Sequence, residues 1–233
     1  KPSKNIFFRT WAIYKNIRKL NYNGMVTVLA TVNSTAPSAL CKLLFINFFL
    51  VSRLGNTLSA EIKNQGIKSH LKKLKQKIIF KLSDLVVFQS NSMKQDALKV
   101  LRLRDSTKFI VINNGIDFLE VSLKSKQESL VEIDTDYFNF ILLGSFKYQK
   151  AYDVLLDAIS IIPKDRINSM RFYICGSDVY GDEAFNKFKV GLEENRLNEC
   201  VYLMGNQENP YPLIKQMDAY ILPSRYEGFP NSL

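Results

Sequence analysis

The segment from Gly144 to Lys150 has the composition of an anion-binding loop. Gly144 follows an apolar run, residues 138–143, and a glycine lets the backbone approach a ligand closely. The loop leads into a predicted helix over residues 152–162, whose free N–H groups favour negative charge, and Lys147 and Lys150 add positive charge. The segment is neither a G-x-G-x-x-G fingerprint nor a Walker loop. It has the outline of a phosphate site, although a plain strand-to-helix turn with solvated lysines explains it equally well.

Two further predicted strands also end at a glycine. Gly176 follows the run 171–175, and Gly205 follows the run 201–204, just as Gly144 follows its own strand. Tight turning alone can place a glycine after a strand. A glycine after each of three strands nevertheless favours a shared binding edge.

The fourth predicted strand of this half, residues 219–222, leads into a proline-stiffened segment that contains a carboxylate. The segment reads Pro223-Ser224-Arg225-Tyr226-Glu227-Gly228-Phe229-Pro230. Carboxylates accept strong hydrogen bonds, so Glu227 beside Gly228 suits the binding of sugar hydroxyls.

These segments interrupt an alternation of strands and helices that runs along most of the chain. Such alternation is typical of an α/β fold with parallel sheets and helices on both faces, where ligands bind beyond the carboxyl ends of the strands. Residues 138–233 are expected to form a four-stranded parallel sheet, and Asn91 or Ser92 is expected to cap a helix. The predicted strands cover residues 25–32, 48–53, 84–89, 109–112, 138–143, 171–175, 201–204 and 219–222, and the predicted helices cover 59–82, 91–103, 152–162, 182–195 and 211–216.

Charge and composition divide the chain into two domains. The protein has 233 residues and a formal net charge of +10. Residues 1–135 hold 22 lysines and arginines against 9 aspartates and glutamates, whereas residues 136–233 hold 10 against 13. A polar stretch rich in Ser, Lys and Glu separates the two parts. We therefore expect an N-terminal domain over residues 1–118, a linker over 119–136 and a C-terminal domain over 137–233.

The basic excess peaks between Lys63 and Lys81, where seven lysines occur without an acidic residue among them. Apolar residues give the same stretch an apolar side: Leu71, Leu74, Ile78 and residues 80–82. The pattern predicts a basic amphipathic helix. A solvated helix face is the ordinary interpretation, and attraction to an anionic membrane surface is the alternative. Nucleic acid is not expected as a partner, because no binding motif, arginine cluster or aromatic interleaving accompanies the lysines. We expect His70 to face solvent, without a catalytic role.

The remaining composition excludes several classes of protein. Hydrophobic residues make up 46% and charged residues 23%, as in ordinary globular proteins. Cys41, Cys175 and Cys200 form no C-x-x-C pair and, with one histidine in the chain, exclude a Cys/His zinc site. The longest apolar run, residues 43–51, is about half the length that a membrane-spanning helix needs, ~20 residues. No signal peptide is visible. Because the chain has no initiator Met and stops in mid-pattern, we expect it to be a fragment.

In their order along the chain, the segments of the second half resemble the donor-binding domain of a family 4 glycosyltransferase, a retaining enzyme of GT-B fold. The similarity covers roughly residues 85–233, and residues 51–56 resemble a late segment of the acceptor domain. The resemblance implies two Rossmann-like domains with parallel sheets, both incomplete here. The matching segments are Val111–Asp117, Gly144 to Lys150, Asp153–Ala158, Tyr173–Gly176, Val201–Gly205 and Pro223 to Pro230.

The resemblance also implies roles for individual residues. Glu227 matches the first glutamate of the family's E-x7-E motif, which holds the donor hexose, and Lys150 matches the lysine that neutralises the donor diphosphate. Both are expected to be catalytic. Gly205 and Asn206 lie where backbone groups usually read the nucleobase. The expected donor-binding residues are Gly144, Ser145, Lys147, Lys150, Gly176, Gly205, Asn206, Glu227, Gly228, Phe229 and Pro230.

The sequence departs from the family pattern at three points. Ser145 stands where the family usually has an arginine, and Lys147 could substitute for that charge. Ala151 replaces the glycine that usually follows the family lysine, and its methyl group can be accommodated unless the position needs a positive φ. The second glutamate of the E-x7-E motif would fall past Leu233.

Together these features predict a glycosyltransferase that moves a hexose from a nucleotide-sugar, expected to be a UDP-sugar, to a lipid-linked or surface-polysaccharide acceptor with retention of configuration. The pathway would be lipopolysaccharide or capsule biosynthesis. No cofactor and no metal ion is expected, because GT-B enzymes of this kind generally need none. The expected location is the cytoplasm, with peripheral contact to the inner face of the membrane through Lys63–Lys81.

Two other functions stay open. A GT-B-shaped sugar-nucleotide epimerase would bind UDP-GlcNAc and act without an acceptor, and a non-catalytic module would only bind the sugar-nucleotide. A glutamate at the second E-x7-E position would favour the transferase. From residues 1–233 alone we expect weak nucleotide binding and no sugar transfer.

Overall fold

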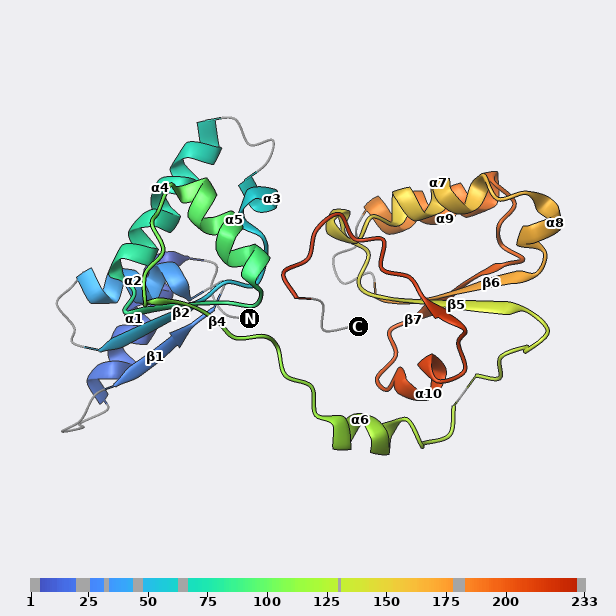
Figure 1. The fold of residues 1–233 in the computed structure, drawn as a ribbon, viewed down its shortest axis with the longest axis horizontal. Coiled ribbons are helices and arrows are strands. Elements are labelled where there is room, and N and C mark those ends of the chain that lie inside the picture. The colour runs from blue at the N-terminus through green and yellow to red at the C-terminus, as the bar shows by residue number, and fades with distance from the viewer. Residues whose placement is uncertain are drawn as a thin grey trace. The chain divides into compact units, whose positions relative to one another are not determined.

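The computed structural model describes residues 5–19, 26–31, 34–43, 48–62, 67–129, 131–177 and 183–229 (Figure 1). Residue contacts divide the chain into two compact units. The first unit extends to Asn114 and also takes in Gly228 and Phe229, and the second extends from Gly115 to Glu227. Each unit is built around its own parallel sheet.

The first unit holds a four-stranded sheet in the order β1-β2-β3-β4, and every neighbouring pair is parallel. The helices that connect these strands contribute to one core cluster with the sheet, in which Leu50, Val86 and Phe88 are fully buried. The elements are α1 (Ile6–Lys19), β1 (Thr27–Ala30), α2 (Thr35–Leu43), β2 (Phe49–Arg53), α3 (Leu58–Ile62), α4 (Ile67–Leu82), β3 (Leu85–Phe88), α5 (Asn91–Leu101) and β4 (Phe109–Val111).

The second unit holds the four-stranded parallel sheet that the sequence predicts, in the order β7-β6-β5-β8. In Figure 1, α7 and α9 cover one face of this sheet and α10 covers the other. Two core clusters correspond to the two faces, one around Leu142 and Ile174 and one around Ile141 and Leu213. The elements are α6 (Phe118–Lys124), β5 (Phe138–Leu143), the 3-10 turn η1 (Tyr148–Lys150), α7 (Tyr152–Ser160), α8 (Lys164–Ile167), β6 (Met170–Cys175), α9 (Glu183–Glu194), β7 (Val201–Gly205), α10 (Tyr211–Ile214) and β8 (Ala219–Tyr220).

Several local predictions need correction. The cap of α5 is Ser90, whose side chain accepts a hydrogen bond from the Met93 N–H, and is neither Asn91 nor Ser92. Helices α1 and α2 were not predicted, and helix α6 overlaps the start of the stretch predicted as a linker, whose bounds stay a prediction. The predicted helix over 59–82 is described as α3 and α4, with residues 63–66 outside the described residues.

The apolar residues of α4 divide between the core and solvent. Ile79 and Phe80 are buried in the core, whereas Leu71, Leu74 and Ile78 are 64%, 57% and 45% exposed. The helix therefore presents apolar side chains to solvent as well as to the core.

Candidate active site

The strand order of the second unit creates a point where ligands bind in open parallel sheets. From β5 the chain proceeds outward through β6 to β7 and then returns to place β8 on the other side of β5. The loops that leave β5 and β8 therefore separate in opposite directions, and the space beyond their carboxyl ends is the usual ligand position. The predicted residues Gly144 to Lys150 follow β5, and Glu227 follows β8.

The three predicted glycines lie side by side at this edge. The Gly144 N–H donates to the Cys175 carbonyl at 2.9 Å, and the Gly176 N–H donates to the Gly205 carbonyl at 2.8 Å. Gly144 (φ +155°) and Gly205 (φ +66°) have backbone conformations that favour glycine. A Cβ on Gly176 would lie 1.8 Å from the Gly144 carbonyl oxygen, so only glycine allows the two loops to pack this closely.

A cavity of about 240 Å³ opens beside these glycines. It brings together four predicted donor-binding residues, Gly144, Ser145, Gly176 and Asn206. Burial raises the pKa of the Cys175 thiol in its wall to about 11, so that side chain is uncharged at neutral pH. The other lining residues are Leu143, Ser177, Gln207 and Pro210.

Lys150 and Glu227, the two residues expected to be catalytic, form an ion pair. Lys150 Nζ lies 2.8 Å from Glu227 Oε1, and each side chain is 19% exposed. A Cβ on Gly144 would lie 3.0 Å from Lys150 Cε, so the lysine side chain lies over the glycine that borders the cavity. Lys150 is thus positioned between the cavity and the carboxylate.

Ala151, which replaces the glycine usual in the family, has a positive φ. Its φ of 53° and ψ of 41° are left-handed, where an L-residue other than glycine costs about 1–2 kcal/mol. The Ala151 N–H donates to the Tyr148 carbonyl and ends η1, immediately after Lys150. This strained turn sets where Lys150 leaves the backbone.

Sequence reasoning missed a clamp formed by Arg225. Its guanidinium donates to both carboxylate oxygens of Asp153, at 2.9 and 2.5 Å, and to the Tyr148 carbonyl at 2.8 Å. The guanidinium also lies 4.2 Å from the centre of the Tyr148 ring. Hydrogen bonding from Arg225 lowers the pKa of Asp153. An arginine two residues before Glu227 was visible in the sequence, but its partner lies 72 residues away.

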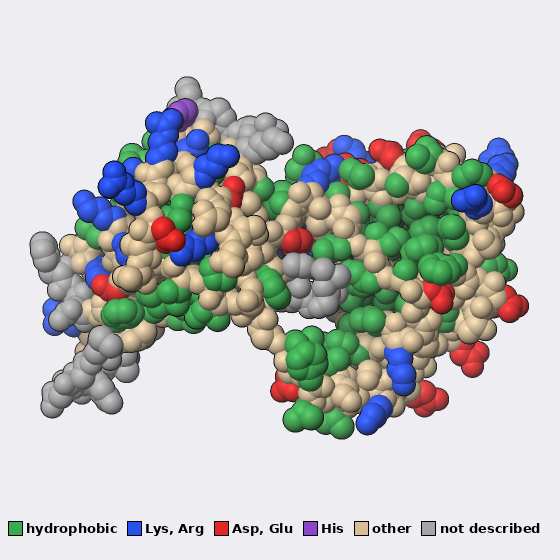
Figure 2. Space-filling view, viewed as in Figure 1, with side chains coloured by type: hydrophobic (Ala, Val, Ile, Leu, Met, Phe, Trp, Pro, Cys, Tyr) green, Lys and Arg blue, Asp and Glu red, His purple; other side chains and the backbone are tan. Residues whose placement is uncertain are grey.

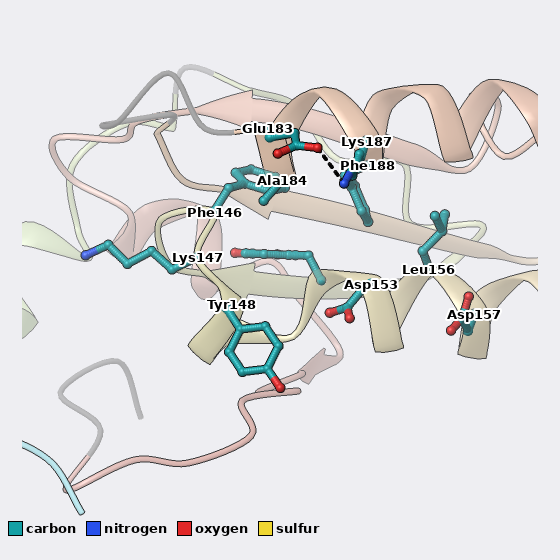
Figure 3. Close-up of a pocket in the computed structure, with 11 residues that line it drawn as sticks. Phe146, Lys147, Tyr148, Asp153, Leu156, Asp157, Glu183, Ala184, Lys187 and Phe188 are labelled. Atoms are coloured by element: carbon teal, nitrogen blue, oxygen red, sulfur yellow. Dashed lines mark ion pairs between the residues drawn. The ribbon is translucent and has the colours of Figure 1, made fainter. Parts of the chain in front are cut away.

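Lys147 lies apart from the 240 Å³ cavity. It lines a separate groove of about 480 Å³ between the first turns of α7 and α9. In Figure 3 its side chain points away from the other labelled residues, while Asp153, Asp157 and the ion-paired Glu183 and Lys187 lie along the groove. Helices α7 and α9 approach closely at Gly191, where a Cβ would lie 2.2 Å from Cδ2 of Leu156, one of the residues that line the groove. The role of Lys147 as a substitute for arginine stays a prediction.

Two other predicted residues belong to the first unit. The Gly228 carbonyl accepts a hydrogen bond from Ser90 Oγ at 3.2 Å, and the Phe229 carbonyl accepts one from Asn114 Nδ2 at 3.3 Å. Pro230 lies outside the described residues. Their part in donor binding stays a prediction.

The described part of the chain shows neither a metal-binding cluster nor a membrane-spanning helix. There, no set of three or more His, Cys, Asp and Glu side chains is arranged to hold a metal ion. None of the helices in the described ranges has the length and apolar character needed to cross a bilayer.

Known proteins resemble this chain in sequence. Residues 124–233 match the family model for glycosyl transferases group 1. An uncharacterized glycosyltransferase of Methanocaldococcus jannaschii is 25% identical over 237 residues, covering 98% of this chain and 56% of that protein. The capsular polysaccharide biosynthesis glycosyltransferase CapH of Staphylococcus aureus is 26% identical over 175 residues, covering 75% of this chain and 46% of CapH. The chain thus spans about half the length of the curated relatives it matches.

A solved structure shows the same fold. HepE of Anabaena in complex with UDP superposes with a TM-score of 0.64 at 16% identity, covering 92% of this chain and 56% of HepE. The predicted α/β fold of GT-B type, with two parallel sheets, is confirmed. The match of residues 124–233 to the glycosyl transferases group 1 model, together with the two relatives, supports a glycosyltransferase.

Proposed function

We propose that the protein is a retaining family 4 glycosyltransferase that moves a hexose from a UDP-sugar to a lipid-linked or surface-polysaccharide acceptor. The observation that carries the proposal is the pairing of Lys150 with Glu227 beside the cavity at the point where the strand order reverses. A cation suited to a diphosphate and a carboxylate suited to sugar hydroxyls stand next to a space lined by glycine backbone.

The chemistry follows from the charges. Transfer breaks the bond between the anomeric carbon of the sugar and the diphosphate, so negative charge accumulates on the departing nucleoside diphosphate. A fixed cation at that position stabilises the transition state more than the ground state. Lys150 supplies this charge, Glu227 accepts hydrogen bonds from the hexose, and the cavity around Gly144, Gly176 and Asn206 holds the nucleotide. We propose that the reaction needs no metal ion.

The proposed donor and acceptor classes draw on the relatives. HepE has been solved in complexes with UDP and with UDP-glucose, which supports a UDP-sugar as donor. CapH is named for capsular polysaccharide biosynthesis, which supports a capsule-type acceptor.

We further propose that α4 contacts the cytoplasmic face of the membrane. Figure 2 shows Lys and Arg side chains gathered over this helix, among which Lys72, Lys75, Lys77 and Lys81 are exposed. Exposed Leu71, Leu74 and Ile78 lie on the same helix. Lysines beside exposed apolar side chains are typical of helices that lie in the interface of an anionic bilayer. Lys63 and the side chain of Lys68 lie outside the described residues.

A donor screen tests the proposed reaction. The full-length protein is incubated with UDP-hexoses and GDP-hexoses, with and without a lipid-linked acceptor, and release of UDP or GDP and transfer of labelled sugar are measured. We expect acceptor-dependent release of UDP in the presence and absence of EDTA. Absence of both turnover and nucleotide binding would contradict the proposal. Acceptor-independent conversion of UDP-GlcNAc would identify an epimerase, and binding without turnover would identify a binding module.

A further inference from the structure

Two consecutive residues of the β5–α7 loop hold the two carboxylate oxygens of Glu227. Lys150 Nζ lies 2.8 Å from Oε1, and Gln149 Nε2 donates to Oε2 at 3.2 Å. Gln149 Nε2 also donates to the Tyr226 carbonyl at 3.0 Å. A glutamine amide has two N–H donors, so these two contacts use both. Gln149 therefore fixes the backbone and the side chain of the same short segment.

Glu227 and the diphosphate of the proposed donor compete for the ammonium group of Lys150. Its ammonium neutralises Glu227 in the present structure, and the proposed function, on which this inference rests, assigns the same ammonium to the donor diphosphate. A diphosphate carries more negative charge than a carboxylate and attracts the ammonium more strongly at similar distance. Glu227 would then lose the Lys150 contact and face a new anion close by.

We propose that Lys150 exchanges Glu227 for the donor diphosphate, and that Gln149 is the positioning residue that keeps Glu227 in place during this exchange. The exchange releases Oε1 to accept a hydrogen bond from a sugar hydroxyl. Oε2 stays with Gln149, so the carboxylate does not swing away from the incoming negative charge. Binding of the diphosphate thereby prepares the sugar-binding carboxylate.

The backbone around Glu227 is held independently of Lys150. The Arg225 N–H donates to the Gln149 carbonyl at 2.8 Å, and the Arg225 guanidinium bonds both Asp153 and the Tyr148 carbonyl. These contacts join the segment after β8 to η1 and α7 without using the lysine ammonium. Movement of Lys150 therefore leaves the segment attached, which partner exchange requires.

Three variants of the protein test the exchange, with UDP as the binding probe and the UDP-hexose found in the donor screen as substrate. Glu227→Gln keeps the size of the side chain but removes the competing charge, so UDP should bind about fivefold more tightly while turnover falls by at least a hundredfold. Gln149→Ala should leave the Kd of UDP within twofold but lower kcat about tenfold. The control is Gln216→Ala, which removes a glutamine that donates to the Pro212 carbonyl on α10, and it should change neither value.

A second measurement distinguishes a positioning role of Gln149 from a purely structural one. The ratio of the Ki of UDP to the KM of the UDP-hexose reports how much the sugar contributes to binding. This ratio should fall in Gln149→Ala and stay constant in Gln216→Ala. The unfolding midpoints of both variants are measured to detect any loss of stability. Unchanged UDP affinity in Glu227→Gln, or an unchanged ratio in Gln149→Ala, would overturn the exchange even if the wild-type protein transfers sugar. Tighter UDP binding by Glu227→Gln in a protein that transfers no sugar would support the exchange and reject the transferase. Absence of UDP binding by the wild-type protein would overturn both.

Discussion

The sheets of the two units have the same number of parallel strands but different strand orders. In the first unit the order β1-β2-β3-β4 follows the sequence, and the connecting helices share one core cluster. Right-handed crossovers that proceed in one direction place their helices on one face. On the other face of the described sheet, Leu29 is 62% exposed and Ile112, just beyond β4, is 55% exposed.

In the second unit the chain reverses direction at β5, and both faces of the sheet are covered. The reversal separates the loops after β5 and β8 and brings Lys150 to Glu227. The position of the candidate active site therefore depends on strand order. Both units contain buried parallel strands and half-buried lysine–carboxylate pairs, but the pair at a reversal of strand order is the one beside a glycine-lined cavity.

The two lysine–carboxylate pairs, Lys150–Glu227 and Lys42–Asp84, should differ in what they support, the first catalysis and the second stability. Loss of activity in the first pair is the largest effect we expect. Lys150→Ala should lower kcat/KM by 10²–10³, the result of losing a transition-state contact of about 3–4 kcal/mol. Lys42→Ala removes the partner of Asp84 in the first unit, where the side chains are 22% and 34% exposed. It should leave kcat/KM within about twofold and lower the free energy of unfolding by about 1 kcal/mol. Steady-state kinetics and urea unfolding of both variants decide the matter, and wild-type kinetics in Lys150→Ala would remove its phosphate role.

A methyl group at the glycine edge should break the site of the second unit specifically. In Gly176→Ala the new Cβ would overlap the Gly144 carbonyl, so the two loops must separate, at a cost of about 1–3 kcal/mol in stability. The Kd of UDP should rise at least tenfold, as measured by titration calorimetry. Gly115→Ala is the matched control, because nothing lies within 4 Å of its would-be Cβ. Equal UDP affinity in the two variants would show that the nucleotide does not bind beside Gly176.

Binding of the basic helix α4 to anionic vesicles should depend on both its positive charge and its exposed apolar area. Neutralising Lys72 and Lys75 together by substitution with Gln should weaken binding to anionic vesicles by roughly 30-fold, at ~1 kcal/mol for each lysine, and salt should weaken wild-type binding. Leu74→Gln should weaken binding at every salt concentration, because it removes apolar surface. Val190→Gln, at a 52% exposed position on α9 of the second unit, is the control. Equal co-sedimentation with neutral and anionic vesicles would exclude the electrostatic part.

The smallest expected effect concerns acid stability of the Arg225 clamp. Hydrogen bonding from Arg225 places the pKa of Asp153 below its unfolded value, so the stability it contributes is present above about pH 4 and is lost as the pH falls through the folded-state pKa. The Asp153 side chain is 64% exposed, so solvent screening limits the contribution to less than about 1 kcal/mol.

Asp153→Asn should therefore lower the unfolding free energy at pH 7, and the difference from wild type should vanish as the pH falls well below 4. Urea unfolding between pH 2 and pH 7 measures this, with Asp157→Asn as the control because Asp157 forms no ion pair among the described residues. A difference that persists unchanged at pH 2 would mean that packing, and not charge, explains the loss.

The strands and the glycine edge could be predicted because their signals are local. Largely apolar runs such as residues 138–143, and the glycine that follows the run, can be recognised without knowledge of the tertiary fold, and β5 matches its predicted bounds. The N-cap of α5 was harder to predict, since Ser90, Asn91 and Ser92 are all good capping residues and the loop geometry selects Ser90. Helices α1 and α2 were missed, and α6 was not expected within a stretch without clear periodicity.

By itself, the sequence determined the alternation of strands and helices, the basic character of the first part, and the residue types at each strand end. Local propensity and formal charge do not depend on the rest of the fold. Tertiary structure decided which strand neighbours which, that Leu71 and Leu74 face solvent, and that Arg225 clamps Asp153. It also decided that Lys150 meets Glu227 across 77 residues of chain. Such contacts depend on the order in which strands join the sheet, and that order is fixed by the packing of whole elements, which no short stretch of residues encodes.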